Sequence, residues 1–414
     1  MPSSVNEYTA VGDALKLAKR HLRSLRKSES IRTLRSYGRI LSQDIVAPTD
    51  VPPSPTSHMD GFAVRSGDLL GATAATPALL RMVGSSGPGE RSKRAAAPHE
   101  AVQVATGALL PEGADTVVPV ESARVMGRMI RISHAQGPGE HVFEAGRDIR
   151  SGQVLLQKGH VIRAQDIGIL ISIGCLRVGV WKRPRVAVIA TGSELTSARK
   201  PRKGKVLESH SPIFIGLAKA LGCDIQDFGV VGDDTRKLSE VLRAALSSSD
   251  LVLTSGGTSA GKRDLVVRAI SGLRPELLIH GLKLDRGRVA GLAVLKGKPV
   301  LMLPGPIQAA ANAFLVVGVP IIEELSGSVG TGLVVPCVIG GVWEARRRFS
   351  DFQKVVYVRL NPGAQPVAEP ISGETESMKL LADADGFFVV PENTTRLEAG
   401  DRVEVRLIPG FSFV

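Results

Sequence analysis

The stretch Val-Ala-Val-Ile-Ala-Thr-Gly-Ser-Glu-Leu at residues 186–195 decides the fold of this chain. Its first five residues form an unbroken apolar run rich in β-branched side chains, which is typical of a strand buried on both faces of a parallel sheet. Two hydroxyl residues, a glycine and a carboxylate follow at once, from Thr191 to Glu194. The sequence therefore predicts a buried strand with polar groups at its carboxyl end.

Two more strands of the same kind are predicted downstream, at 225–231 and 251–254. A helix over 211–221 fits between the first two strands, and apolar residues at i, i+3, i+4 and i+7 predict another helix after residue 235. The third strand runs into the polar segment 255–264. Because open α/β sheets bind ligands outside the carboxyl ends of their strands, we expect a binding site at this edge.

The composition of the 414-residue chain is that of an ordinary globular protein of two to four domains, with 43% hydrophobic and 22% charged residues. Aromatic residues make up only 4%, which argues against a base-stacking nucleic-acid platform. The formal net charge of +12 is spread over segments 20–27, 183–205 and 346–348. This spread favours a phosphorylated small ligand over nucleic acid.

The cysteines and the apolar stretches indicate a cytoplasmic protein. Cys175, Cys223 and Cys337 lie far apart among apolar neighbours, so we expect reduced core residues. The longest apolar stretch, near 309–322, contains Asn312 and Pro320 and falls short of the roughly 18 residues that a membrane span needs. The N-terminal segment is basic and lacks the apolar core of a signal peptide, so no membrane association is expected.

The rest of the chain divides into modules. Residues 8–28 predict an amphipathic helix, and residues 36–44 predict a second, short helix. Between about 54 and 146 the pattern changes to short strands separated by Gly and Pro turns, which predicts a separate β module with strands at 79–83, 101–105, 116–120 and 129–132. The α/β pattern then runs from about 180 to 325, and short strands of a small barrel or sandwich follow.

Seven short motifs, taken together and in this order, resemble those of a known family. They are Met59-Asp60-Gly61-Phe62-Ala63-Val64, Thr106-Gly107-Ala108 with Ala114-Asp115, Gly146-Arg147-Asp148-Ile149, Thr191-Gly192-Ser193-Glu194-Leu195, Asp233-Asp234, Ser255-Gly256-Gly257 with Asp264, and Leu303-Pro304-Gly305. On these residues the chain resembles the molybdopterin molybdenumtransferases of the MoeA type, a family shared with the E domain of gephyrin. The resemblance covers nearly the whole chain.

The resemblance implies a multidomain α/β and β fold. It implies an elongated, segmented domain I (1–53 and 147–179), an inserted β domain II (54–146), a central doubly wound α/β domain III (180–327) and a C-terminal small β-barrel domain IV (328–414). It also implies a homodimer whose active cleft lies between domain III of one subunit and domain II of the other. The further partners that it implies are the adenylyltransferase of the same pathway and the acceptor molybdoenzymes.

The implied activity belongs to molybdenum cofactor biosynthesis: the Mg²⁺-dependent insertion of molybdate, or tungstate, into adenylated molybdopterin with release of AMP. The residues that match the family's motifs carry the implied roles. The catalytic residues are Asp60, Thr106, Asp148 and Glu194. The substrate-binding residues are Thr191, Gly192, Ser255, Gly256, Gly257, Ser259, Arg288, Pro304 and Gly305. The Mg²⁺ ligands are Asp233, Asp234 and Asp264.

The residue chemistry agrees with this activity, although each residue type also has a plainer explanation. Mg²⁺ needs only one or two protein carboxylates beside substrate phosphate, and glycines allow backbone amides to approach phosphate closely. The three aspartates could equally be helix N-caps, and Asp60 ahead of Gly61 could be an ordinary turn. By the same reasoning Gly256-Gly257 could be a turn, and Thr106 and Glu194 solvated loop residues. His58, His210 and His280 are not at metal-binding spacing and are expected to be structural.

The chain departs from the family pattern around the expected oxyanion end of the site. Ser193 and His210 stand where the family usually has Asp and Asn. The family's Lys-Pro-Gly-Lys-Pro loop reads Asp285-Arg286-Gly287-Arg288-Val289, which reverses the first charge, and the second proline of the Leu-Pro-Gly-Asn-Pro turn is displaced, leaving Ile307 in its place. These changes leave open an altered choice of oxyanion or a weakened paralogue.

Three other classes of function compete with the molybdenum insertase. A pterin adenylyltransferase could use the same α/β module but would not need the β module that carries Asp60 and Thr106. A non-catalytic scaffold is favoured by Asp285 and disfavoured by the retained Asp60, Glu194 and Asp264. A nucleic-acid binder is disfavoured by the scarcity of aromatic residues.

Overall fold

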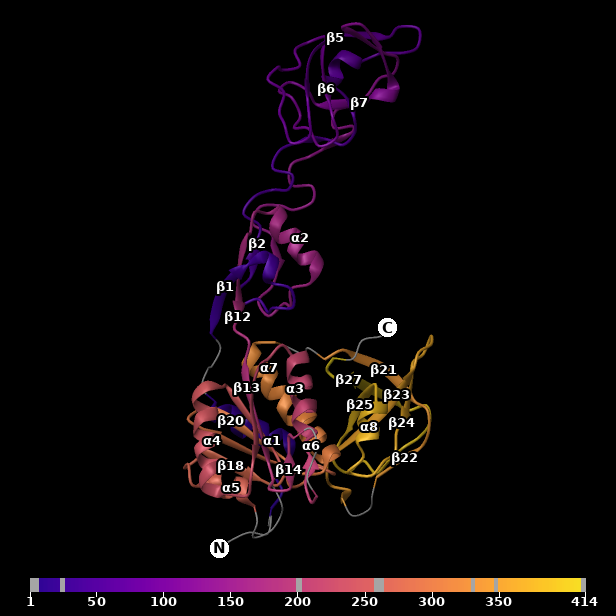
Figure 1. The fold of residues 1–414 in the computed structure, drawn as a ribbon. Coiled ribbons are helices and arrows are strands. Elements are labelled where there is room, and N and C mark those ends of the chain that lie inside the picture. The colour runs from indigo at the N-terminus through magenta and orange to yellow at the C-terminus, as the bar shows by residue number, and fades with distance from the viewer. Residues whose placement is uncertain are drawn as a thin grey trace. The chain divides into compact units, whose positions relative to one another are not determined.

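The computed structural model describes residues 7–22, 27–198, 203–256, 264–328, 332–345 and 349–410. The chain forms two compact units, and Figure 1 labels their helices and strands. The first, which we call the α/β–barrel unit, comprises the described parts of 1–29, 38–42 and 179–414. The second, the β unit, comprises 30–37 and 43–178.

A six-stranded sheet forms the centre of the α/β–barrel unit. Its strand order is β16 (Asp224–Val231), β13 (Arg185–Thr191), β17 (Leu251–Ser255), β20 (Lys298–Leu303), β19 (Gly291–Leu295) and β18 (Leu277–His280). The first four strands are parallel, whereas β19 is antiparallel to both of its neighbours. The three predicted strands are confirmed as β13, β16 and β17, and their carboxyl ends meet at one edge.

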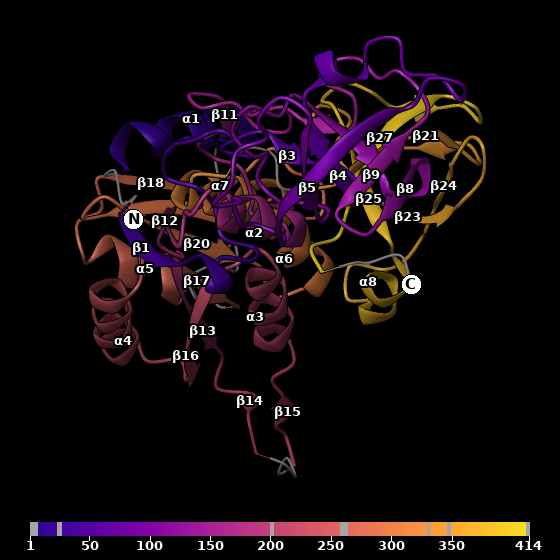
Figure 2. The same ribbon diagram turned by 90° about the horizontal axis from the view of Figure 1, so that it is seen from above.

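Helices cover both faces of this sheet, which confirms the predicted doubly wound α/β domain. Val188 on β13 packs with Phe214 of α3 (His210–Ala220) and with Phe314. The next residue, Ile189, packs on the other face with α4 (Thr235–Ser248) and α5 (Leu265–Ser271), through Leu242 and Val266. Figure 2 shows α3 and α4 on opposite sides of β13.

A long apolar helix passes through the core of the same unit. It consists of α6 (Ile307–Ala313), the π-helical segment η4 (Phe314–Gly318) and α7 (Val319–Ser326). Its length and composition would allow it to cross a membrane, but 78% of its most apolar stretch is buried against the rest of the protein. The helix runs through Asn312 and Pro320, which interrupt the apolar run in the sequence, and its burial identifies it as a core helix.

The N-terminal helix differs from the sequence prediction in length and in location. Helix α1 covers Val11–His21 rather than 8–28, and β1 (Ser28–Arg32) follows. The apolar face of α1 enters the core of the α/β domain through Val11, Ala14 and Ala18, whereas the predicted domain boundaries placed the helix in the segmented domain I. A salt bridge of 2.9 Å from Lys19 Nζ to Glu324 Oε2 joins it to α7.

The helix predicted over 36–44 is wrong. The only helical residues in its vicinity form the short 3-10 helix η1 (Thr33–Arg35), and the described residues 36–44 form turns and an isolated bridge between Leu41 and Val180. Gly38 adopts φ +69°, a left-handed conformation that ends a helix and that glycine adopts at little cost.

The C-terminal part of the chain closes into a small barrel, as predicted. Its strand order is β21 (Val334–Ile339), β24 (Val367–Pro370), β23 (Lys354–Asn361), β25 (Gly386–Val390) and β27 (Arg402–Leu407). Val358, Phe388 and Val405 fill its interior. Tyr357, also on β23, instead joins the core of the α/β domain, where its hydroxyl donates to Asn312 Oδ1 at 2.9 Å.

The β unit contains a second six-stranded sheet. Its order is β7 (Thr116–Pro119), β4 (Gly61–Val64), β6 (Glu100–Val104), β5 (Ala78–Ser86), β9 (Met129–Ile132) and β8 (Ala123–Met126). Side chains of β4 enter two cores, with Phe62 on one face and Ala63 on the other. The four predicted strands of the β module are confirmed as β5, β6, β7 and β9, with small shifts at their ends.

The segmented part of the β unit joins two distant stretches of the chain. Strand β2 (Ile45–Val46) pairs with β11 (Val154–Leu156), and helix α2 (Ala164–Ser172) follows. Cys175 is half-buried here, whereas Cys223 and Cys337 are buried in the other unit, and all three are free thiols. The expectation of core cysteines is met by Cys223 and Cys337, whereas Cys175 is only half-buried.

Candidate functional site

Five of the predicted site residues line one hollow at the carboxyl edge of the parallel sheet. The hollow has a volume of about 250 Å³, and its predicted members are Thr191, Glu194, Ser255, Gly256 and Gly305. They come from the ends of β13, β17 and β20. The remaining wall is formed by β14 (Leu195–Thr196), β15 (Val206–Leu207) and residues 208–210, and Figure 2 shows the two strands extending away from the sheet.

Hydrogen bonds between strand ends hold this hollow in shape. Thr191 Oγ1 donates to the carbonyl of Ser255 at 3.2 Å, and the amide of Gly256 donates to Leu303 O at 3.1 Å. The amide of Gly192 donates to Val231 O at 3.0 Å. Because each contact joins a different pair of strands, the polar groups at the edge are fixed relative to one another.

Gly192 and Gly256 are required by the close approach of the backbone at this edge. A Cβ on Gly256, whose φ is +85°, would lie 2.5 Å from Thr191 O. A Cβ on Gly192, whose φ is +150°, would lie 2.6 Å from the carboxylate of Glu194. Side chains at these positions would therefore force the backbone or Glu194 to move.

We expect Gly256→Ala to destabilise the protein more than Gly222→Ala. Both glycines have left-handed φ angles, which cost alanine roughly 1–2 kcal/mol. A Cβ on Gly222 would meet no atom within 4 Å, whereas a Cβ on Gly256 would meet the Thr191 carbonyl. Urea denaturation of the two variants would measure the difference in the free energy of unfolding. Equal losses would show that the Thr191 contact imposes no constraint.

Glu208 is a residue of the hollow that the sequence motifs did not assign. Its Oε1 accepts hydrogen bonds from the amides of His210 (2.9 Å) and Ser211 (2.8 Å), and thereby caps the first turn of α3. Burial lowers the pKa of His210, so the imidazole is neutral at pH 7. A carboxylate just ahead of a predicted helix start was the signal that could have identified this cap.

A second hollow of about 440 Å³ adjoins the first at the segment 304–306. Arg286 and Arg288 of the loop 284–289 line it, together with Pro304. The Arg288 guanidinium lies 5.2 Å from the centroid of the Phe349 ring, a cation–π contact. Six of the predicted substrate-binding residues are therefore divided between two adjacent hollows, whereas Gly192 lines neither of them.

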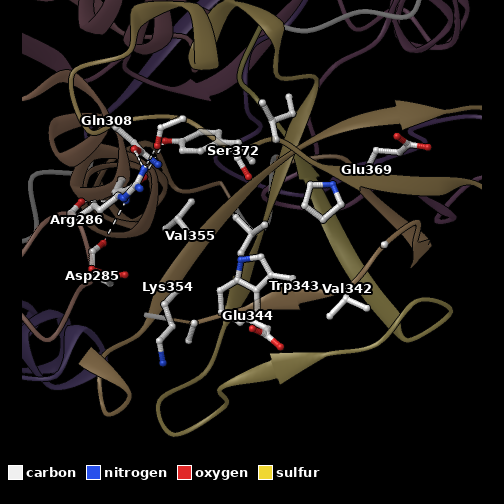
Figure 3. Close-up of a pocket in the computed structure, with 18 of the residues that line it drawn as sticks. Asp285, Arg286, Gln308, Val342, Trp343, Glu344, Lys354, Val355, Glu369 and Ser372 are labelled. Atoms are coloured by element: carbon white, nitrogen blue, oxygen red, sulfur yellow. Dashed lines mark hydrogen bonds between the residues drawn. The ribbon is translucent and has the colours of Figure 1, made fainter. Parts of the chain in front are cut away.

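A third hollow, of about 760 Å³, lies between α6 and the barrel (Figure 3). Arg286 Nη1 donates to Gln308 Oε1 and to the carbonyl of Gly373, and these groups lie together on one side of the hollow, with Glu369 on the other. The sequence did not predict this hollow, because its walls come from segments that only tertiary packing brings together.

The basic groups of the third hollow are held close to acidic ones. Lys354 Nζ donates to Ser350 O at 2.6 Å and to Thr394 O at 3.2 Å. Burial lowers the pKa of Lys354, and the negative charge of Asp285 acts in the opposite direction. The charge reversal noted at Asp285 thus places a carboxylate near a buried lysine.

In the β unit, Asp60 and Thr106 form a direct pair. The amide and the hydroxyl of Thr106 both donate to Asp60 Oδ1, at 2.7 and 2.9 Å, and these hydrogen bonds lower the pKa of Asp60. Asp60 lines a hollow of about 480 Å³ with Gly61, Ser86 and Ala105. Asp148 is also exposed in this unit but does not line that hollow.

Two of the three predicted metal ligands, Asp234 and Asp264, have the capping role that the sequence left open. Asp234 caps α4, because its Oδ1 accepts from the amides of Arg236 (2.8 Å) and Lys237 (3.1 Å). Asp264 caps α5, because its Oδ1 accepts from Val267 N at 3.0 Å. The backbone amide of Asp233 donates to Ser193 Oγ at 2.8 Å, which links this loop to the end of β13.

The same carboxylates can be compared with the needs of a divalent cation. Among the residues that the structure describes, no three His, Cys, Asp or Glu side chains converge on one point that could hold a metal. Asp264 Oδ2, however, is buried and has no hydrogen-bond partner there. Since Mg²⁺ needs few protein ligands beside phosphate and water, this orphaned carboxylate oxygen fits such an ion. Gly257 and Ser259 lie outside the described residues.

The architecture defined by these elements is matched by three protein-family models. The MoeA N-terminal region (domain I and II) matches residues 9–174, the probable molybdopterin binding domain matches 187–324, and the MoeA C-terminal region (domain IV) matches 343–408. The chain thus has the domain content of a molybdopterin biosynthesis enzyme of the MoeA class.

Individual relatives give the same result over the full length of the chain. The molybdopterin molybdenumtransferase of Staphylococcus epidermidis is 30% identical over 409 residues, covering 98% of this chain and 96% of its own. That of Staphylococcus aureus is 29% identical over 378 residues, covering 90% and 89%. The crystal structure of the MoeA protein from Pyrococcus horikosii, 29% identical, covers 98% of this chain and 100% of its own with a TM-score of 0.87. The chain belongs to the molybdopterin molybdenumtransferase family, and it is an enzyme of molybdenum cofactor biosynthesis.

Proposed function

We propose that this enzyme inserts molybdate, or tungstate, into adenylated molybdopterin, cleaves the phosphoanhydride bond of that substrate and releases AMP. The observation that carries the proposal is the pair of adjacent hollows at the carboxyl edge of the α/β domain, together with the third hollow that shares Arg286 with the second. The first offers strand-end amides and hydroxyls, and the next two contain arginine and lysine side chains. A substrate with a phosphate chain and a separate oxyanion needs both kinds of surface.

The phosphate chain fits the first hollow. Gly256 has no side chain to block access to its backbone, and the hydroxyls of Thr191 and Ser255 lie beside it. Glu194 stands at the same edge, exposed and therefore free to act on a bound phosphate or its attacking water. These features support the substrate-binding roles of Thr191, Gly192, Ser255, Gly256 and Gly305.

The oxyanion fits the hollows next to the loop 284–289. Molybdate and tungstate are tetrahedral dianions, for which arginine and lysine side chains are suitable partners. Arg286 and Arg288 supply positive charge there, and Lys354 lines the third hollow. Asp285 reduces the local positive potential and would therefore weaken the binding of either oxyanion.

A divalent cation, Mg²⁺ in the first instance, is part of the proposed reaction. When bound, it would neutralise charge on the phosphoanhydride oxygens. Asp264 would hold it through its orphaned oxygen, with Asp233 and Asp234 as the other candidate carboxylates. The remaining coordination positions would belong to phosphate oxygens and water.

Three residues of the β unit, Asp60, Thr106 and Asp148, are proposed to act in the same reaction. The main support is the direct hydrogen bonding between Asp60 and Thr106. In the family arrangement, domain II of one subunit completes the site of the other. We propose the cytoplasm as the place of reaction, the pathway's adenylyltransferase as the source of substrate, and molybdoenzymes as acceptors of the product.

We expect a homodimer in solution. A site completed by a second subunit requires one, so multi-angle light scattering at micromolar concentration should give about 87 kDa, twice the 43.7 kDa of the chain. A mass of one chain under these conditions would exclude the shared site.

The proposed function is tested by incubating the purified protein with adenylated molybdopterin, Mg²⁺ and molybdate. AMP release measured by chromatography and molybdenum bound to the pterin measured by mass spectrometry should rise together, and omission of the cation should abolish both. AMP release without molybdenum in the product would show a hydrolase, and no AMP release would reject the proposal.

A further inference from the structure

Two close His–Asp pairs among the described residues have very different surroundings, whereas a third, His99 and Asp68, has 3.9 Å between its facing atoms. In the β unit, His160 Nε2 lies 2.6 Å from Asp166 Oδ2 in an aligned hydrogen bond. In the α/β domain, His280 Nε2 lies 3.1 Å from Asp264 Oδ2. The two pairs consist of the same side chains but differ in the hydrogen-bond partners of the aspartate and the histidine.

The His160–Asp166 pair is complete without a ligand. Arg163 donates three hydrogen bonds to the Asp166 carboxylate, from its amide at 2.8 Å and from its guanidinium at 3.1 and 2.9 Å. These contacts lower the pKa of Asp166 despite its burial. A cation is already present in this pair, so a metal ion has no place there.

The His280–Asp264 pair is incomplete. His280 Nε2 and Asp264 Oδ2 are close, but the angles at the two atoms do not meet the criteria for a hydrogen bond. Each atom is buried and has no other hydrogen-bond partner among the described residues. Asp264 is only 7% exposed. Unless His280 is protonated and the two form an ion pair, these two buried polar atoms are open to a third group that would satisfy both.

The position of the pair points to the substrate edge of the sheet. Strand β18 runs in the same direction as β20 and β17, because β19 is antiparallel to both β18 and β20. His280 ends β18 at the carboxyl edge, and Asp264 begins α5 after the loop that follows β17. The pair therefore lies at the edge at which Thr191, Ser255 and Gly256 line their hollow.

We propose that His280 Nε2 and Asp264 Oδ2 are two ligands of one divalent cation. Neighbouring ligand atoms around a six-coordinate ion with bonds of about 2.1 Å stand roughly 3 Å apart, and each points at the ion rather than at the other. The observed separation of 3.1 Å and the lack of alignment both agree with this arrangement.

An imidazole ligand changes which metal the site prefers. Mg²⁺ favours oxygen ligands, whereas a mixed nitrogen and oxygen set suits Mn²⁺ and later divalent ions. The inference therefore predicts tighter binding of Mn²⁺ than of Mg²⁺. The assignment of the two protein ligands rests on the structure without substrate. Only the role of the cation beside substrate phosphate rests on the proposed function.

The test is pulsed electron paramagnetic resonance of Mn²⁺ added to the full-length protein without substrate. A directly bound imidazole produces modulation of the Mn²⁺ echo by ¹⁴N. This modulation should be present in the wild type and in His160→Gln, and absent in His280→Gln. Because loss of a residue that only orients a ligand costs about 10- to 100-fold in metal affinity, loss of His280 itself should weaken Mn²⁺ binding at least that much.

Wild-type protein that binds Mn²⁺ without ¹⁴N modulation, or modulation that survives in folded His280→Gln, would overturn the inference. If His280→Gln fails to fold, Asp264→Asn and wild-type protein labelled with ¹⁵N-histidine give the same test. Failure of the proposed function is distinguishable, because a protein that shows the modulation but releases no AMP would keep the metal site and lose the reaction.

Discussion

Asp264→Asn is expected to lower cation-dependent AMP release by about 10- to 1000-fold, equivalent to roughly 1.4–4 kcal/mol of transition-state stabilisation. The substitution keeps the shape of the side chain but removes its negative charge and the carboxylate oxygen that faces His280. A cation that relies on few protein ligands should be strongly affected by the loss of one. Initial rates of AMP release at a series of Mg²⁺ and Mn²⁺ concentrations would measure the effect.

The same variant separates metal binding from helix capping. Asparagine caps helices as well as aspartate does, so the hydrogen bond to Val267 N should persist and the melting temperature should change little. Asp250→Asn is the matched control, because Asp250 accepts from Arg185 N at 2.9 Å at the opposite edge of the sheet. Wild-type rates in Asp264→Asn would reduce Asp264 to a cap, whereas slow rates in both variants would indicate a general effect of charge.

Asp60→Ala should reduce turnover by about 100-fold or more with little change in melting temperature. Asp60 is exposed and its pKa is lowered by Thr106, so it is ionised at neutral pH and available as a base or an orienting group. Thr106→Ala should show a smaller loss of the same kind, because the amide of Thr106 still donates to Asp60. Thr106→Ser should retain most activity.

A close structural counterpart provides the control for this prediction. Asp115 accepts hydrogen bonds from the amide (2.6 Å) and the hydroxyl (2.8 Å) of Ser66, as Asp60 does from Thr106, but it does not line the Asp60 hollow. Asp115→Ala should therefore leave the rate of AMP release near that of the wild type. Equal activity of Asp60→Ala and Asp115→Ala would mean that the Asp60 turn is purely structural.

The strands of the α/β domain could be predicted because their signal is local. Each predicted strand is a short run of apolar residues. Because such a strand is buried on both faces, its residues do not alternate between apolar and polar as those of a half-exposed strand do. The polar residues that follow β13 and β17 were placed at one edge by topology alone. In the structure Thr191, Glu194, Ser255 and Gly256 do line one hollow there.

The sequence predictions failed where contacts between distant segments of the chain determine the structure. Periodicity predicted an apolar face on α1 but could not say which domain would cover it. Gly38 interrupts the segment 36–44, and its left-handed φ outweighs the helical pattern around it. The third hollow, with Arg286 and Lys354 in its walls, is assembled from both domains of its unit and has no continuous motif.

The ambiguity at Asp264 could not have been resolved from the sequence. A capping aspartate and a metal-binding aspartate occupy the same position before a helix. Only the structure shows that one of its oxygens caps α5 while the other faces His280, a residue expected from the sequence to be merely structural. Its spacing along the chain gave no sign of this contact.

The location of α1 has a consequence for how the protein is made. The helix leaves the ribosome well before the sheet that covers Val11, Ala14 and Ala18, because that sheet is completed only when β18, β19 and β20 have been synthesised. In the interval the whole β unit is synthesised. A fragment that begins at residue 180 would lack α1, which would leave Leu282 and Leu292 without their apolar cover. We expect this fragment to aggregate unless residues 7–22 are added as a separate peptide.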